Sequence, residues 1–85
     1  MSQPDARRPP DLRLVQAVRD EVKRLRREGQ IPVEVRLGQD AWNGVSPEMR
    51  FAPHGGRRAL LLDGLPCVLV VGREGFEVRT IAPRE

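Results

Sequence analysis

Residues 65–71, Leu-Pro-Cys-Val-Leu-Val-Val, form an unbroken apolar run that constrains the fold more than any other feature. A short apolar run bounded by glycine turns is typical of a buried β-strand. Successive strand side chains point to opposite faces, so both faces of this strand are apolar. One face carries Cys67, Leu69 and Val71, and the other carries Val68 and Val70. We therefore expect this strand at the centre of a sheet, covered on both sides.

A second strong pattern precedes it, between Asp11 and Gly29. Its apolar residues are spaced as on one face of an α-helix. They are Leu12, Val15, Val18, Val22 and Leu25, with Leu14 at the margin. Asp11 is a typical N-cap after two prolines, and Gly29 is a typical C-terminal residue with a left-handed backbone. The pattern predicts an amphipathic helix of about five turns.

Shorter elements lie on either side of the middle of the chain. Residues 31–37 alternate between apolar and charged side chains, which predicts a half-exposed strand. Residues 40–44 and 46–49 favour single helical turns, with Asp40 and Ser46 as their N-caps. Residues 53–58 predict a loop of hairpin type. Strands over 59–62 and 76–81 then flank the central run, the first of them ending at the tight-turn pair Asp63-Gly64.

The predicted fold class is α+β, with one long N-terminal amphipathic helix packed on a three- to four-stranded, mostly antiparallel sheet. One or two helical turns separate the first strand from the others. Residues 11–82 form the single domain, because 85 residues suffice for only one core. Residues 1–10, with three prolines, are expected to be a flexible leader, and residues 83–85 a tail.

The composition argues against several classes of protein. Cys67 is the only cysteine, which excludes an internal disulfide and fits a reducing, cytoplasmic location. No apolar run approaches the roughly 20 residues of a membrane span, so we expect no membrane partner. His54 is the only histidine and lies in the predicted loop, without a metal-ligand cluster or an activated nucleophile nearby in sequence. We therefore expect a non-enzymatic protein without metal or cofactor.

The basic residues support one of two functional hypotheses. Two groups of cations are candidates for contact with phosphates: Arg19, Lys23, Arg26 and Arg27 on one flank of the helix, and Arg57 and Arg58 after the glycine pair. Helical spacing also lets Asp20 pair with Lys23 and Arg24, and Arg24 pair with Glu28, which favours a self-paired, solvated face. Arginine richness also fits the composition of a GC-rich genome. Nucleic-acid binding is therefore the alternative hypothesis.

The hypothesis that we prefer is protein binding or assembly. The chain is too short to cover both apolar faces of residues 65–71, so a partner protein or a second copy is expected to supply the cover. The candidate contact residues are Trp42, Val68, Val70 and Phe76. Trp42, the only tryptophan, either caps the small core or serves as a half-exposed interface anchor.

Residues 61–71, Leu-Leu-Asp-Gly-Leu-Pro-Cys-Val-Leu-Val-Val, resemble a strand motif of small tailed-phage proteins and of the axial domain of tailed-phage major capsid proteins. Residues 33–42, a strand followed by Asp-Ala-Trp, resemble the segment that precedes this motif. The resemblance covers residues 12–81 in element order, with Cys67 where the motif usually has valine. It implies a phage or prophage origin, a location in host cytoplasm or virion, and a structural or host-directed binding role without catalytic residues.

Overall fold

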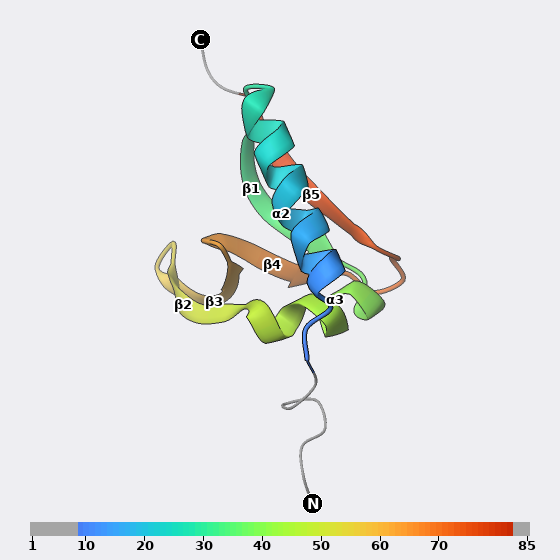
Figure 1. The fold of residues 1–85 in the computed structure, drawn as a ribbon. Helices are drawn as coiled ribbons and strands as arrows, with labels where there is room; N and C mark the ends of the chain where they lie inside the picture. Colours follow the sequence, from blue (N-terminus) through green and yellow to red (C-terminus); the bar gives the residue numbers. More distant parts are fainter. Residues whose placement is uncertain (1–8, 83–85) are drawn as a thin grey trace, which may run out of the picture.

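The long helix α2 (Leu12–Arg27) lies across a β-sheet in the computed structural model, which describes residues 9–82 (Figure 1). The other elements follow in the order β1 (Ile31–Leu37), α3 (Gln39–Val45), the 3-10 helix η1 (Ser46–Glu48), β2 (Arg50–His54), β3 (Arg57–Leu62), β4 (Leu65–Leu69) and β5 (Phe76–Ile81). The predicted α+β class with one long helix is confirmed. Most of the predicted leader and the predicted tail lie outside the described residues.

The ends of α2 agree with the prediction. The Asp11 carboxylate accepts a hydrogen bond from the backbone N–H of Leu14 at 3.2 Å, which satisfies one of the free donors of the first turn. The Asp11 N–H itself donates to the Gly44 carbonyl at 2.8 Å and so ties the helix start to α3. Gly29 has φ 85°, the left-handed conformation that ends many helices.

The sheet has five strands in the order β2-β3-β4-β1-β5, so the prediction of three to four strands was too low. Three of the four pairings are antiparallel, and β1 runs parallel to β4 with Val35 opposite Cys67. Parallel neighbours need a long crossover. Here residues 38–64 supply it, and they contain α3, η1 and the β2–β3 hairpin.

The strand that the sequence did not predict is β2. It pairs with β3 around Gly55 and Gly56, whose φ values of 62° and 82° are those of a type I′ hairpin turn. The predicted loop at 53–58 is therefore wrong in extent, since only the two glycines form the turn. β2 is a mostly exposed edge strand with Pro53 near its end, and it lacks the apolar alternation that marks a half-buried strand.

The predicted helical turns exist, but the N-cap of each lies one or two residues before the expected one. The N-cap of α3 is Gly38 rather than Asp40, which lies in the first turn. The N-cap of η1 is Val45 rather than Ser46, and Pro47 follows in the first turn. Short polar residues favour both the cap and the first turn of a helix, which explains these small errors.

The core lies between α2, α3 and the sheet. Its main cluster consists of residues that expose 2% of their surface or less: Val15, Val18, Val35, Leu37, Ala41, Val45 and Leu62. β4 occupies the central position of the sheet, as predicted, but β1 beside it is the more deeply buried strand. Leu12, predicted on the apolar stripe, is 67% exposed at the start of the helix.

Gly38 is the point where the chain leaves β1 and enters α3. Its N–H donates to the Gly75 carbonyl at 2.8 Å, and its carbonyl accepts from the Trp42 N–H at 2.7 Å. Its φ of −72° is open to any residue. A methyl group there would instead collide with the backbone carbonyl of Arg73 and lie 3.2 Å from the Glu74 Cα. Close packing against the β4–β5 connection therefore requires glycine at position 38.

We expect Gly38→Ala to lower the free energy of unfolding by about 3 kcal/mol, because backbone atoms cannot rotate away from the added methyl group. The matched control is Gly29→Ala, where the space is open and only the left-handed backbone opposes a side chain, at about 1 kcal/mol. Urea unfolding followed by circular dichroism measures both. Equal losses for the two variants would contradict the packing argument.

Candidate functional site

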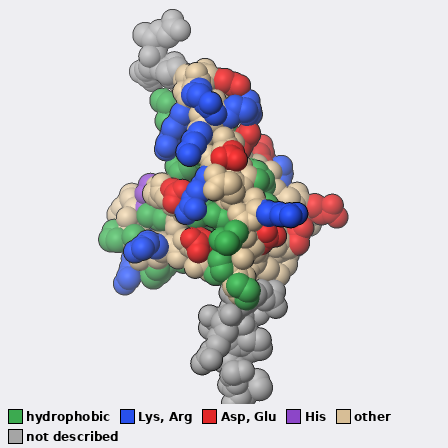
Figure 2. All heavy atoms as spheres, viewed as in Figure 1, with side chains coloured by type: hydrophobic (Ala, Val, Ile, Leu, Met, Phe, Trp, Pro, Cys, Tyr) green, Lys and Arg blue, Asp and Glu red, His purple; other side chains and the backbone are tan. Residues whose placement is uncertain are grey.

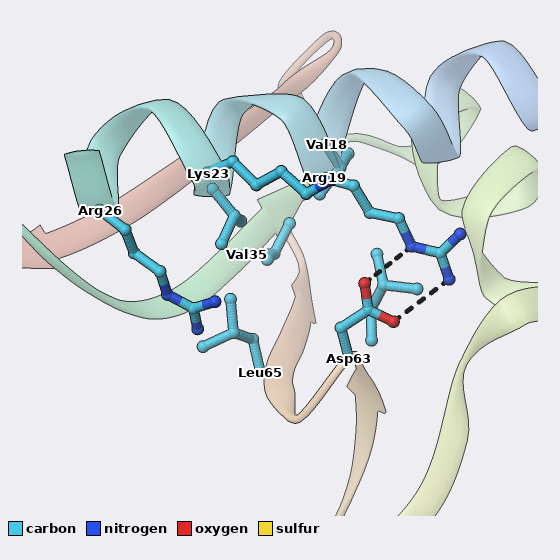
Figure 3. A pocket seen from close by; sticks show the side chains of 9 residues that line it. Val18, Arg19, Lys23, Arg26, Val35, Asp63 and Leu65 are labelled. Carbon is cyan, nitrogen blue, oxygen red and sulfur yellow. Dashed lines mark hydrogen bonds and ion pairs between the residues drawn. The ribbon is translucent and has the colours of Figure 1, made fainter.

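A hollow of about 360 Å³ lies between α2 and the end of the β3–β4 hairpin (Figure 3). Apolar side chains from helix and sheet make its floor, and charged side chains make its rim. The floor consists of Val18, Val22, Val35, Leu62 and Leu65, and the rim consists of Arg19, Lys23, Arg26 and Asp63. We call this hollow the α2–β4 groove. Its volume is at the lower end of the range for ligand-binding pockets.

The local structure of the chain explains where the floor and rim come from. Positions three and four apart on α2 project to one side, which places Arg19, Lys23 and Arg26 along one flank of the apolar stripe. Asp63 and Gly64 have φ values of 52° and 86°, so they form a two-residue type I′ turn between β3 and β4. This turn presents the Asp63 carboxylate toward the helix (Figure 3).

One end of the groove is closed by a two-pronged ion pair. The guanidinium of Arg19 donates to both carboxylate oxygens of Asp63, from Nε at 2.7 Å and from Nη2 at 3.2 Å. Glu48 lies 3.9 Å from the same guanidinium. The hydrogen bond to Asp63 raises the pKa of Arg19. The pair is half-exposed, so it contributes at most about 1 kcal/mol to stability and serves mainly to hold the turn against the helix.

The other two cations of the rim are differently placed. Lys23 and Arg26 have no ion-pair partner among residues 9–82, and both are exposed. In Figure 3 the Arg26 side chain extends from the helix toward Leu65, over the apolar floor. The groove therefore combines an apolar floor with positive charge that no described carboxylate neutralises.

The other basic residues of the helix are partly neutralised. Arg24 bonds Glu21 at 2.7 Å and Glu28 at 2.6 Å, and this contact lowers the pKa of Glu21 and raises that of Arg24. The predicted Arg24–Glu28 pair is confirmed. The predicted pairs of Asp20 are wrong, because Asp20 accepts a hydrogen bond from Gln16 at 2.8 Å. Lys and Arg side chains nevertheless gather over the C-terminal half of α2 (Figure 2).

The six predicted nucleic-acid residues form two separate groups. Four lie on α2, of which Arg27 lies outside the groove lining. Arg57 and Arg58 begin β3, directly after the hairpin turn that projects away from the helix (Figure 1). The Arg58 guanidinium lies over the Phe51 ring, 4.6 Å from its centroid. These two arginines therefore belong to the hairpin and not to the α2–β4 groove.

The four predicted partner residues are not gathered into one surface. Trp42 and Phe76 are half-buried and pack against the core, and Phe76 lies opposite Leu37 on the helix-covered face. Val68 lies opposite Arg36, one position out of phase with the buried residues, and therefore on the other face. Val70 follows the end of β4, where its N–H donates to the Leu37 carbonyl at 2.8 Å.

The open face of the sheet is more polar than β4 alone suggests. Glu34 on β1 lies 3.2 Å from Arg36 and 3.4 Å from Arg79 of β5. Of these three side chains Arg36 lies directly opposite Val68, which is 38% exposed. Within residues 9–82 this face of β4 is therefore bordered by charged side chains and remains exposed at Val68, and the second cover that we expected for it stays a prediction.

Two further candidates have ordinary environments. His54 lies opposite Arg57 in the hairpin and is exposed. Cys67 is half-buried in β4, with its thiol 3.6 Å from the Leu65 carbonyl. No three side chains of the His, Cys, Asp and Glu types come together in residues 9–82 in a way that would hold a metal ion. Among the residues that the structure describes, neither has the partners of an activated nucleophile or base.

Compared with known proteins, the chain matches no family model, no curated protein and no solved structure. Across the described part of the chain, no helix has both the length and the apolar character needed to span a membrane.

Sequence reasoning found the cations of the groove but not the residues that make it a groove. Asp63 was interpreted only as a turn residue, and Leu62 and Leu65 only as strand residues. Val22 was predicted on the apolar face of the helix, where it is half-exposed and lines the floor of the groove. One signal was present, since the acidic turn Asp63-Gly64 is flanked by leucines. Its position below Arg19 depends on a contact between residues 44 positions apart.

Cys67 gives a prediction about pH. Burial raises the pKa of its thiol to about 11, above the roughly 8.5 of an exposed cysteine. The folded state therefore favours the neutral thiol, and stability falls as pH rises from about 8.5 through 11. We expect alkylation by iodoacetamide at pH 8 to be more than about tenfold slower in the folded protein than in urea. Equal rates, measured by mass spectrometry, would contradict the burial of this thiol.

Proposed function

We propose that the protein is a non-enzymatic protein-binding module that receives a peptide segment of a partner in the α2–β4 groove. The segment would place an aliphatic side chain on the floor and a neighbouring carboxylate between Lys23 and Arg26. The observation that carries this proposal is the apolar floor beside two cations that have no carboxylate partner in residues 9–82.

The distribution of polarity in the groove supports a peptide over a small molecule. Pockets for small ligands hold a few convergent polar groups inside an apolar cavity. Here the core contains no buried polar or charged side chain among the described residues, and all charges stand at the rim. An apolar centre surrounded by a polar rim is the organisation of a protein–protein contact.

The same charges argue against nucleic acid as the principal partner. A phosphate backbone is bound by several cations that neutralise several phosphates, and carboxylates beside those cations repel it. In this protein Asp63 and Glu48 stand beside Arg19, and Glu21 and Glu28 stand beside Arg24. An apolar floor of valines and leucines also has no group that binds phosphate. It can bury an aliphatic side chain, which gains about 25 cal/mol of free energy per Å² of apolar surface removed from water.

The resemblance of residues 61–71 to tailed-phage proteins is compatible with this proposal and stays a prediction. It would make the partner another structural protein of a particle or a protein of the host. Whichever it is, the groove requires an apolar side chain next to an acidic one.

The test is a selection from a random peptide library displayed on filamentous phage, with the full chain immobilised. We expect the enriched peptides to share an aliphatic residue next to aspartate or glutamate. The double variant Lys23→Gln/Arg26→Gln should bind a synthetic consensus peptide about tenfold more weakly, because two partly exposed charge contacts are lost. Fluorescence polarisation measures the dissociation constants.

The matched control is Arg13→Gln/Arg27→Gln, which removes the same charge from the same helix but outside the groove lining. Its affinity for the peptide should be unchanged. A library without enriched sequences, or equal loss in both double variants, would overturn the proposal. Retention of a DNA or RNA oligonucleotide at about 50 mM salt, weakening steeply as the salt concentration rises, would support the nucleic-acid alternative instead.

A further inference from the structure

The two edges of the sheet differ in how open they are to another strand. β2, at one edge, contains Pro53, which cannot donate a backbone hydrogen bond. β5, at the other edge, spans the six residues Phe76–Ile81 without proline and pairs only with β1 in the described structure. An edge strand of this kind presents a row of unpaired N–H and C=O groups.

The side chains of β5 divide into two sets. Val78 lies opposite the buried Val35, is half-buried and packs against the core. Glu77 and Arg79, on either side of it, point to the open face because side chains alternate along a strand. They are 47% and 49% exposed, although Glu77 contacts Arg73 at 3.1 Å and Arg79 contacts Glu34 at 3.4 Å. Both charges are therefore at the surface of the free edge.

This charge pattern is complementary to itself. If a second β5 pairs antiparallel with Val78 opposite Val78, each Glu77 lies opposite an Arg79, and the two-fold axis repeats this contact. Two neighbouring registers also keep both α2 helices on the same side of the sheet. In one of them Glu77 lies opposite Glu77, and in the other Arg79 lies opposite Arg79. They place two glutamates or two arginines directly opposite each other, which is unfavourable. Charge therefore selects one register out of three.

We propose that the β5 edge binds a second copy of this chain, in the antiparallel register with Val78 opposite Val78. The two sheets then form one continuous sheet with both α2 helices on the same side, because the two-fold axis is perpendicular to the sheet. The arrangement satisfies the edge groups of both β5 strands and leaves the α2–β4 groove of each copy open. This proposal stands on the β5 edge and does not depend on the peptide-binding function.

The test uses sedimentation equilibrium of the full chain over a range of concentrations. We expect the unmodified protein to dimerise. The single variants Glu77→Arg and Arg79→Glu each place like charges opposite one another at both contacts. Each should raise the dimer dissociation constant by at least about tenfold. Circular dichroism melts check that both variants still fold.

The decisive part of the experiment tests whether the two single variants restore dimerisation when they are mixed. An equimolar mixture of Glu77→Arg and Arg79→Glu chains should form a mixed dimer, because every cross-strand contact is again between opposite charges. The double variant Glu77→Arg/Arg79→Glu should dimerise with itself for the same reason. Lys23→Gln/Arg26→Gln is the control outside the interface, and it should dimerise like the unmodified chain.

Two results would overturn the proposal. One is an unmodified protein that stays monomeric at about 1 mM, the range of weak association. The other is a dimer that the two single variants do not weaken. Failure of the equimolar mixture of these variants to form a mixed dimer would count equally against the proposal. Loss of peptide binding with intact dimerisation would refute the groove function alone, so the two proposals fail separately.

Discussion

The pairing of β1 with a strand on each side determines where the other elements lie. β1 runs parallel to β4 and antiparallel to β5, and its Val35 and Leu37 expose none of their surface. A parallel neighbour cannot follow directly in the chain, so the crossover at 38–64 must bring the chain back to the end of the sheet where β1 begins. Gly38 begins that crossover against the β4–β5 connection, and α3 then packs beside the start of α2.

The α2–β4 groove follows from this arrangement. The helix lies over β1, while the β3–β4 turn approaches its flank from the side, and the side chains between them do not fill the space. The Arg19–Asp63 contact closes one end of the hollow, and Val22 remains half-exposed. The same topology leaves β5 at an edge. Helix flank and sheet edge are thus two separate surfaces, one suited to a peptide and one to a second copy.

Local elements could be predicted where neighbouring residues decide the conformation. The helix between Asp11 and Gly29 and the turn at Asp63-Gly64 depend on caps, glycine and short-range spacing, and both are present. β2 could not be predicted, because an exposed edge strand has no buried face to impose alternation. The groove was also beyond prediction, since its floor joins residues of α2, β1, β3 and β4.

The sequence by itself determined the α+β class, the helix, the central position of β4 and the cations along one helix flank. Each depends on a periodicity or a residue type that acts within a few positions. Only the tertiary structure decided that β1 lies parallel to β4 and that charged neighbours flank Val68. It also decided that Asp63 neutralises Arg19, whereas Lys23 and Arg26 are left without such a partner among residues 9–82. Those outcomes depend on contacts between distant parts of the chain, which packing selects and local spacing does not encode.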